Sequence, residues 1–167
     1  MEKTVTYLEM TSRLELKPGR VVPSMGLWRE DGLSALARSV QARVGAAYGW
    51  RSSTRSDQEW QELARAHPHR QYWLIKLAGE TVGIAALEPQ PGGVVEIRTF
   101  GLLPEYVGQG LGGRALTLAL QQAWATEPLD AEIVRRVWLN TNSKDHPSAL
   151  LNYQRRGLRI YRTEVEE

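Results

Sequence analysis

The sequence predicts an α/β fold (α+β) that combines an antiparallel meander with later βαβ-like crossovers. Two strand-like runs are joined by Ala78-Gly79-Glu80, which is a hairpin signal. Helical and strand-like segments then alternate toward the end of the chain, as they do in crossover connections. A length of 167 residues suits a single domain, 1–167, with one sizeable core.

The first half of the chain predicts one strand followed by two helices. Val5–Met10 is expected to form a short strand. Apolar residues recur at helical spacing over 29–48, which predicts an amphipathic helix. A second helix is expected over 53–66, where Ser56 and Glu59 have the spacing of a capping box.

The second half predicts five strands and two helices. The expected strands are Gln71–Leu77, Thr81–Leu87, Val94–Leu103, Val134–Asn140 and Leu158–Thr163. The expected helices are 110–124 and 147–155, the second with Asp145 as its N-terminal cap. The predicted order is therefore β-α-α-β-β-β-α-β-α-β.

The composition excludes several classes of protein. The chain has no cysteine, which excludes disulfides, thiolate metal sites and cysteine nucleophiles. Its apolar runs are too short for a membrane-spanning helix, and the N-terminal residues lack a signal-peptide core. We therefore expect a soluble cytoplasmic protein with no membrane partner and no metal; His67 and His69 are interpreted as surface residues.

The charged residues are dispersed along the chain. The net charge is +2, and no block of five or more like charges occurs. This pattern argues against a nucleic-acid partner. Arginine pairs such as Arg135–Arg136 and Arg155–Arg156 could lie near a phosphate, but they are interpreted as solvated surface charge.

A glycine-rich stretch, with Gly108, Gly110, Gly112 and Gly113, separates a predicted strand from a predicted helix. Glycine costs roughly 1 kcal/mol in a helix interior relative to alanine, so packing does not explain it. A glycine turn that leads into a helix N-terminus favours anion binding. A Walker-type loop is excluded, because Lys and Ser or Thr do not follow Gly113. A dinucleotide fingerprint is disfavoured, because the spacing comes late, after a meander.

The run Val94–Trp124 resembles the central motif of the GCN5-related N-acetyltransferase (GNAT) family, whose [Arg/Gln]-x-x-Gly-x-[Gly/Ala] loop binds the acyl-CoA pyrophosphate. The glycine pattern matches Gly108–Gly112, whereas Val107 stands where the family usually has Arg or Gln. The family's next motif, Ala with Tyr four residues on and then Gly-[Phe/Leu], matches Ala149–Leu158. The resemblance implies a mixed, mostly antiparallel sheet with a splayed central strand pair and helices on both faces.

The resemblance also implies acetyl-CoA as the cosubstrate. Its pyrophosphate would lie on the glycine loop, and its thioester arm would lie between the splayed strands, held by backbone groups. The residues expected to bind acetyl-CoA are Phe100, Leu102, Leu103, Gly108, Gln109, Gly110, Leu111, Gly112, Gly113 and Asn142.

Three residues are candidates for the chemistry. The family's tyrosine at the position of Tyr153 protonates the leaving thiolate, a task that suits a phenol; core packing is the alternative. Glu96 is implied as a general base, with the role of a cross-strand partner for arginine left open. His146 stands where the family commonly has an asparagine that contacts the CoA arm. It could bind the arm, act as a base, or be an exposed residue of the first helical turn.

The acceptor pocket is expected at the loop between the first two helices. Tyr48 and Trp50, joined by Trp28 and Trp138, could stack on a flat or cationic group, with core packing as the alternative. The expected function is direct transfer of an acetyl group from acetyl-CoA to a primary amine of a small molecule in a ternary complex. No cysteine is present to carry the acyl group. Protein or peptide acetylation, non-catalytic acyl-CoA binding and a homodimer all stay open.

Overall fold

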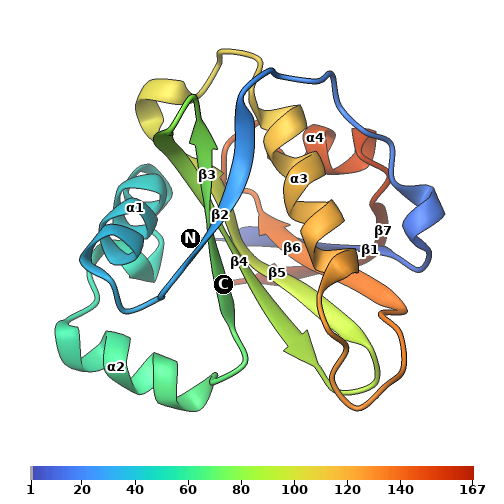
Figure 1. Cartoon of the computed structure of the whole chain (residues 1–167), viewed down its shortest axis with the longest axis horizontal. Helices are drawn as coiled ribbons and strands as arrows, with labels where there is room; N and C mark the ends of the chain where they lie inside the picture. The colour runs from blue at the N-terminus through green and yellow to red at the C-terminus, as the bar shows by residue number, and fades with distance from the viewer. Residues whose placement is uncertain (1) are drawn as a thin grey trace.

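One sheet of seven strands organises residues 2–167, the part of the chain that the computed structural model describes (Figure 1). Its strands are β1 (Lys3–Met10), β2 (Met25–Glu30), β3 (Gln71–Leu77), β4 (Glu80–Gln90), β5 (Val94–Leu102), β6 (Arg136–Asn142) and β7 (Arg159–Glu166). The α-helices are α1 (Ala35–Gly45), α2 (Asp57–Ala66), α3 (Gly112–Ala125) and α4 (Ala149–Arg155).

The sheet is mixed and mostly antiparallel, in the order β2-β3-β4-β5-β6-β1-β7. All neighbouring strands are antiparallel except β5 and β6, which run parallel. The β5–β6 ladder joins Val94–Glu96 to Arg136–Trp138, and the strands diverge beyond these residues. The predicted fold class is therefore confirmed, together with its splayed central pair.

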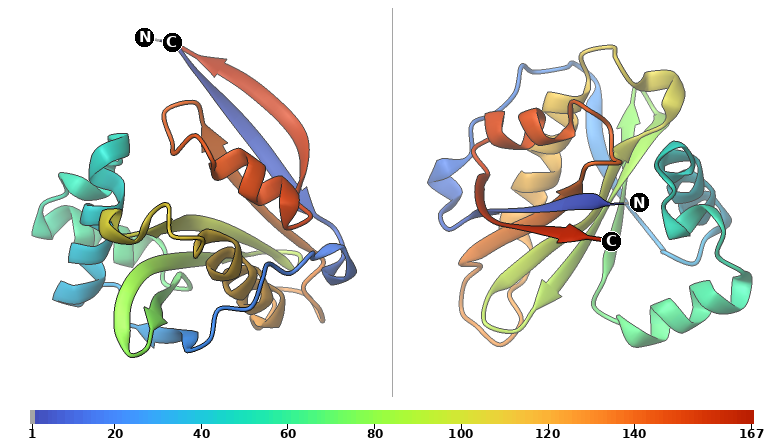
Figure 2. Two further views of the ribbon diagram at one scale, coloured as in Figure 1. Left: turned by 90° about the horizontal axis from the view of Figure 1, so that it is seen from above. Right: turned by 180° about the vertical axis from the view of Figure 1, so that it is seen from behind.

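β1 has an internal place in the sheet although it comes first in the chain. It pairs antiparallel with β6 along one edge and with β7 along the other. β1 and β7 swing away from the body of the sheet together, as the left panel of Figure 2 shows. The predicted strand Val5–Met10 is confirmed, whereas its place between two strands from the end of the chain depends on the tertiary fold.

The predicted helix 29–48 is wrong at its beginning, where the chain forms β2. This segment pairs with β3 along its whole length, as the edge strand of the sheet. Gly32 then carries the chain over the ring of Tyr72, where a Cβ would overlap the ring carbons. Helix α1 begins only after Ser34, whose Oγ accepts a hydrogen bond from Ala37 N at 3.0 Å. Pairing with β3 therefore prevails over the helical periodicity.

The other predicted elements are confirmed, with shifts of a few residues at their ends. The capping box of α2 is also present: Ser56 Oγ accepts from Glu59 N at 3.2 Å, and Glu59 Oε1 accepts from Ser56 N at 3.0 Å. None of the helices within residues 2–167 is both long and apolar enough to cross a membrane.

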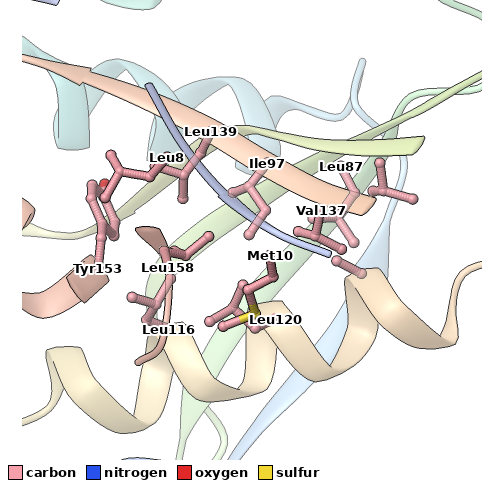
Figure 3. Close-up of a cluster of buried hydrophobic side chains, with 12 residues drawn as sticks. Leu8, Met10, Leu87, Ile97, Leu116, Leu120, Val137, Leu139, Tyr153 and Leu158 are labelled. Carbon is pink, nitrogen blue, oxygen red and sulfur yellow. The ribbon is translucent and has the colours of Figure 1, made fainter. Parts of the chain in front are cut away.

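Apolar clusters hold helices against both faces of the sheet. On one face, called here the α3 face, Leu116 and Leu120 of α3 pack with Leu8 of β1 and Leu139 of β6 (Figure 3). On the other, called the α1 face, Val44 of α1 packs over β3 and β4. Each fully buried side chain of this kind contributes on the order of 2 kcal/mol. These contacts fix α3 against the sheet, and the glycine loop leads directly into its first turn.

Candidate active site

A cavity of about 660 Å³ lies where β5 and β6 diverge. Its walls come from the end of β5, the glycine loop, the first turn of α3, helix α4 with the turn before it, the loop after α1, and Arg20 in the segment before β2. Segments that are far apart in the sequence therefore meet at the splay of the sheet.

β5 presents an unpaired edge to this cavity. Leu103 N donates to Val82 O of β4 at 2.8 Å, so it points away from the opening. Because successive N–H groups of a strand point in opposite directions, those of Leu102 and Phe100 face the splay. Phe100 and Leu102 line the cavity, whereas Leu103 is a core residue that is 4% exposed. Two backbone donors are thus available to polarise a carbonyl group.

The glycine loop turns the chain sharply into α3. Gly108 and Gly110 have φ angles of 82° and 77°, in the left-handed region that favours glycine. α3 begins at Gly112, and no side chain caps its N-terminus. Its first turn lines the cavity, so unpaired N–H groups with partial positive charge lie at the wall. Leu111 is only 8% exposed and anchors the loop in the core.

Two arginine side chains supply the positive charge that Val107 cannot. Arg20 Nη2 lies 3.3 Å from the position of a Cβ on Gly110, and Arg156 Nη1 lies 2.6 Å from that of a Cβ on Gly113. Both arginines line the cavity. Arg156 Nε is buried and has no hydrogen-bond partner within residues 2–167. The interpretation of Arg156 as solvated surface charge is therefore wrong, because the end of α4 places it over the first turn of α3.

Tyr153 belongs both to the core and to the cavity wall. It packs in the α3-face cluster (Figure 3), is 8% exposed, and lines the cavity. Burial, with a further contribution from the Asp145 carboxylate, raises the pKa of Tyr153 above the usual range of a phenol. A phenol is protonated at neutral pH, so the hydroxyl group is a hydrogen-bond donor at this wall.

The predicted cap of α4 by Asp145 is wrong. The Asp145 carboxylate instead accepts hydrogen bonds from Trp50 Nε1 at 3.0 Å, Thr141 Oγ1 at 2.7 Å and Asn142 N at 3.0 Å. The residue at the N-cap is Ser148, whose side chain makes no capping bond. Asp145 therefore holds the indole of Trp50 in the cavity wall, a role that sequence analysis missed because its partner lies on a distant loop.

Tyr48 and His146 complete this wall, with ring centroids 6.4 Å apart in an edge-on arrangement. Burial, followed by the charge of Asp145, raises the pKa of Tyr48. His146 Nδ1 accepts a hydrogen bond from Ser148 N at 3.0 Å. A neutral ring with Nδ1 as acceptor carries its proton on Nε2, so His146 can act as a donor.

Glu96 lies outside the cavity wall, at the last residue pair before β5 and β6 diverge. Its neighbours Val95 and Ile97 belong to the α3-face cluster, so alternation places Glu96 on the α1 face. The residue is 5% exposed, and its carboxylate accepts from Gln90 Nε2 at 3.2 Å and Arg98 Nη1 at 3.3 Å. The arginine partner thus comes from the same strand and not from a neighbouring one.

Four further candidates lie away from the cavity. Trp28 is 61% exposed on the edge strand β2. Trp138 Nε1 donates to Gln90 Oε1 at 3.0 Å on the α1 face. The side chain of Asn142 accepts a hydrogen bond within its own turn, and Gln109 Nε2 donates to the main chain of the loop before it. The residues that the structure does bring together are Tyr48, Trp50, Phe100, Leu102, Gly108, Gly110, Gly112, Gly113, His146 and Tyr153.

The splayed parallel pair, with a glycine-turned helix at its opening, is the arrangement that the resemblance of the sequence implied. The family model described as Acetyltransferase (GNAT) family matches residues 37–158, and the chain belongs to this family of acetyl-CoA-dependent acyltransferases. No protein of curated function matches the sequence.

Several solved structures share this fold. A GCN5-related N-acetyltransferase from Kribbella flavida has a TM-score of 0.62 and 21% identity, over 97% of this chain and 56% of that one. One from Sphaerobacter thermophilus has a TM-score of 0.65 and 12% identity, over 98% and 50%. A tandem GNAT protein from the clavulanic acid biosynthesis pathway has a TM-score of 0.62 and 16% identity, over 98% and 51%. The chain thus spans about half the length of these structures, and the likeness concerns the fold.

Proposed function

We propose that residues 1–167 act as a single N-acetyltransferase domain, which transfers an acetyl group from acetyl-CoA to a primary amine of a small molecule in a ternary complex. One observation supports this most strongly. The cavity between β5 and β6 has anion-binding groups at the glycine loop, and it has Tyr153 opposite the free backbone edge of β5.

The residues present suit a pyrophosphate at the glycine loop. The first turn of α3 offers unpaired N–H groups, and Arg20 and Arg156 offer charge-assisted hydrogen bonds. The unpartnered Arg156 Nε is one such donor. These guanidinium groups supply the positive charge that an arginine at position 107 would supply and that Val107 does not.

In the proposed reaction the neutral amine nitrogen attacks the thioester carbonyl carbon, so that a C–N bond forms and the C–S bond breaks. The N–H groups of Phe100 and Leu102 stabilise the negative charge on the carbonyl oxygen, an effect worth about 3 kcal/mol for one good donor. Tyr153 gives its proton to the departing sulfur. The amine loses one proton and the sulfur gains one, so the protons balance once Tyr153 is reprotonated.

The two remaining candidates, His146 and Glu96, have different proposed roles. Because His146 Nδ1 already accepts from Ser148, its Nε2–H is suited to hold a carbonyl oxygen of the CoA arm rather than to remove a proton. The amine proton then leaves through water on the α1 face, where Glu96 is the remaining candidate base.

The proposal is tested by thiol release from acetyl-CoA in the presence of amino acids, polyamines, aminoglycosides and peptides, each assayed separately. We expect amine-dependent release of CoA, together with a small amine whose mass increases by one acetyl group. Tight CoA binding without release by any amine would contradict the proposal and favour a non-catalytic acyl-CoA-binding role. Release with peptides alone would favour protein or peptide acetylation.

A further inference from the structure

The sheet has two edge strands, β2 and β7, and β7 is the more exposed of the two. β7 pairs only with β1, so its outer edge has no neighbouring strand within residues 2–167. All of its residues are exposed except Glu164, which is partly buried. In the left panel of Figure 2, no other strand lies beyond it. The main-chain N–H and C=O groups of this edge are therefore free to pair with another strand.

β7 lacks several features that normally prevent such pairing. Natural edge strands are commonly short, interrupted by proline or protected by lysine. β7 has eight residues, RIYRTEVE, with no proline, glycine or lysine among them, and it exposes Ile160 and Val165 at 44% and 64%. β2 has six residues, including Gly26, and the Lys76 ammonium lies 4.7 Å from the ring of Trp28. β7 is therefore the edge that is better suited to pairing.

The register with β1 shows which face of the sheet each side chain of β7 takes. Arg162 lies opposite Tyr7, and Ile160 lies opposite Leu8, so Tyr161 is the extra residue of a β-bulge. β1 thus accommodates Tyr161 and Arg162 as one position, and the other side chains alternate between the two faces. Those on the α1 face are Arg159, Arg162, Glu164 and Glu166, and those on the α3 face are Ile160, Thr163 and Val165.

The charged side chains of β7 are complementary to those of a second β7. With the bulge counted as one position, Thr163 is the middle of the strand. An antiparallel copy with Thr163 opposite its own counterpart brings Arg162 opposite Glu164. The same register brings Arg159 opposite Glu166. Each pair occurs twice, because the arrangement has two-fold symmetry, and opposite charges at facing positions stabilise a strand pair.

The apolar side chains fit the same register on the α3 face. Ile160 lies opposite Val165 of the copy, again twice, with Thr163 between the two pairs. β2 has no such pattern. An antiparallel copy of β2 in full register would place Met25 opposite Glu30 and would pair no opposite charges. Self-complementarity is therefore a property of β7 and not of both edges.

The charges of β7 also have partners within one copy. The ion pairs are Arg162–Glu164 on the same strand, Arg159–Glu15 at 3.2 Å and Glu166–Lys3 at 3.5 Å. The side chains of Arg162 and Glu164 are 55% and 41% exposed, and exposed ion pairs contribute little to stability. They can therefore be exchanged for pairs between copies. The charges then determine the register and direction of pairing, while main-chain hydrogen bonds and apolar pairs supply the attraction.

We propose that two copies of the chain form a symmetric dimer in which their β7 strands pair antiparallel about Thr163 and join the two sheets. Because each copy has one β7, the association ends at two copies. A parallel pair would place like charges opposite each other, which destabilises it. One pair of strands is smaller than a standard interface, so the dimer should be weak and should dissociate on dilution. No residue of β7 lines the cavity between β5 and β6, so this inference is independent of the proposed function.

The test is sedimentation velocity over a range of protein concentrations, with the charge pair reversed one side at a time. The wild type should pass from monomer to dimer as its concentration rises. Arg162→Glu and Glu164→Arg each place like charges opposite each other, so each should raise the dissociation constant of the dimer about 10-fold or more. An equal mixture of the two variants restores both opposite-charge pairs and should dimerise as the wild type does. A change in the stability of either fold alone would not produce this recovery.

Arg65→Glu is the matched control, because it makes the same change of charge at an exposed arginine of α2. Its dissociation constant should equal that of the wild type. A wild type that stays monomeric up to about 1 mM, or that forms assemblies larger than a dimer, would overturn the proposal. Single variants that are folded by circular dichroism and dimerise as the wild type does would overturn it, as would a mixture that does not recover.

A single cysteine tests the register, since the chain has no cysteine of its own. Facing residues of an antiparallel pair have Cβ atoms about 4.5–5.5 Å apart, so Thr163→Cys should form a disulfide between copies under mild oxidation. Arg29→Cys, at an exposed position of β2, is the control and should form little of it. Equal disulfide formation in the two variants would overturn the register about Thr163.

Discussion

The phenol of Tyr153 lies between the apolar cluster under α3 and the cavity wall, so its ring and its hydroxyl have separate tasks. The ring fills the core beside Leu116 and Leu139, as a phenylalanine ring would. The hydroxyl, which is protonated at neutral pH as an ordinary phenol is, meets the leaving sulfur in the proposed reaction. A change that removes only the oxygen therefore separates chemistry from packing.

Tyr153→Phe should lower kcat by about 100-fold, because the thiolate then leaves without a proton donor. The KM of acetyl-CoA and the melting temperature should stay nearly the same. Thiol release measures kcat and the KM of acetyl-CoA, and thermal unfolding measures the melting temperature. A kcat equal to that of the wild type would remove Tyr153 from the mechanism.

The charge near the glycine loop gives a second prediction at the scale of single residues. Arg156→Gln should raise the Kd of CoA by about 10-fold or more, because a charge-assisted contact to phosphate is lost. Titration calorimetry with CoA provides the measurement. Arg135→Gln, an exposed arginine after α3, is the control and should leave the Kd unchanged. Equal affinity in the two variants would place the pyrophosphate elsewhere.

At the scale of elements, the glycine loop depends on backbone conformation more than on side chains. Gly110→Ala places a Cβ in the left-handed region, at a cost of roughly 1–2 kcal/mol, and brings it 3.3 Å from Arg20 Nη2. The variant should lose stability and should also bind CoA more weakly. Unfolding in urea and CoA titration measure the two effects.

Gly79→Ala is the matched control for the loop. Gly79 has a φ of 84° in the β3–β4 hairpin, and its Cβ would meet no atom within 4 Å. This change should reduce the free energy of unfolding by a similar amount and leave CoA affinity intact. If both variants weaken CoA binding equally, the loss in Gly110→Ala reflects general destabilisation.

Elements with a strong local pattern are the ones that sequence analysis predicts correctly. The β3–β4 hairpin and α3 follow from a turn signal and from helical spacing, and both form close to the predicted residues. β2 does not, because its pairing with β3 is a contact between segments far apart in the sequence. Sheet formation at an edge depends on the partner strand, which no local periodicity encodes.

At the scale of the whole molecule, β1 joins the two ends of the chain. Leu8 of β1 is fully buried between β6, β7 and α3. Leu8→Ala should therefore reduce the free energy of unfolding by about 2–5 kcal/mol. Denaturant titration gives the value. Val165→Ala on β7, where the side chain is 64% exposed, should change it by less than about 0.5 kcal/mol. Similar losses in both variants would contradict the internal place of β1.

The candidate site contains residues that local sequence motifs identify and residues that only the fold brings together. The glycine loop and the Ala149–Leu158 segment are short motifs, so their expected roles can be inferred from residues that are adjacent in the sequence. Arg20 and Asp145 carry no local motif, because each meets a partner from another segment. Their roles become visible only when the sheet brings those segments together.

The sequence by itself determined the order of most elements, the glycine-rich turn into α3 and the motif that contains Tyr153, since periodicity and short motifs are local properties. Only the tertiary structure decided that β1 lies between β6 and β7, that Arg20 and Arg156 lie against the glycine loop, and that Asp145 holds Trp50. The physical reason is the range of the interactions. Hydrogen bonds and charges that join distant segments exist only after the chain has folded.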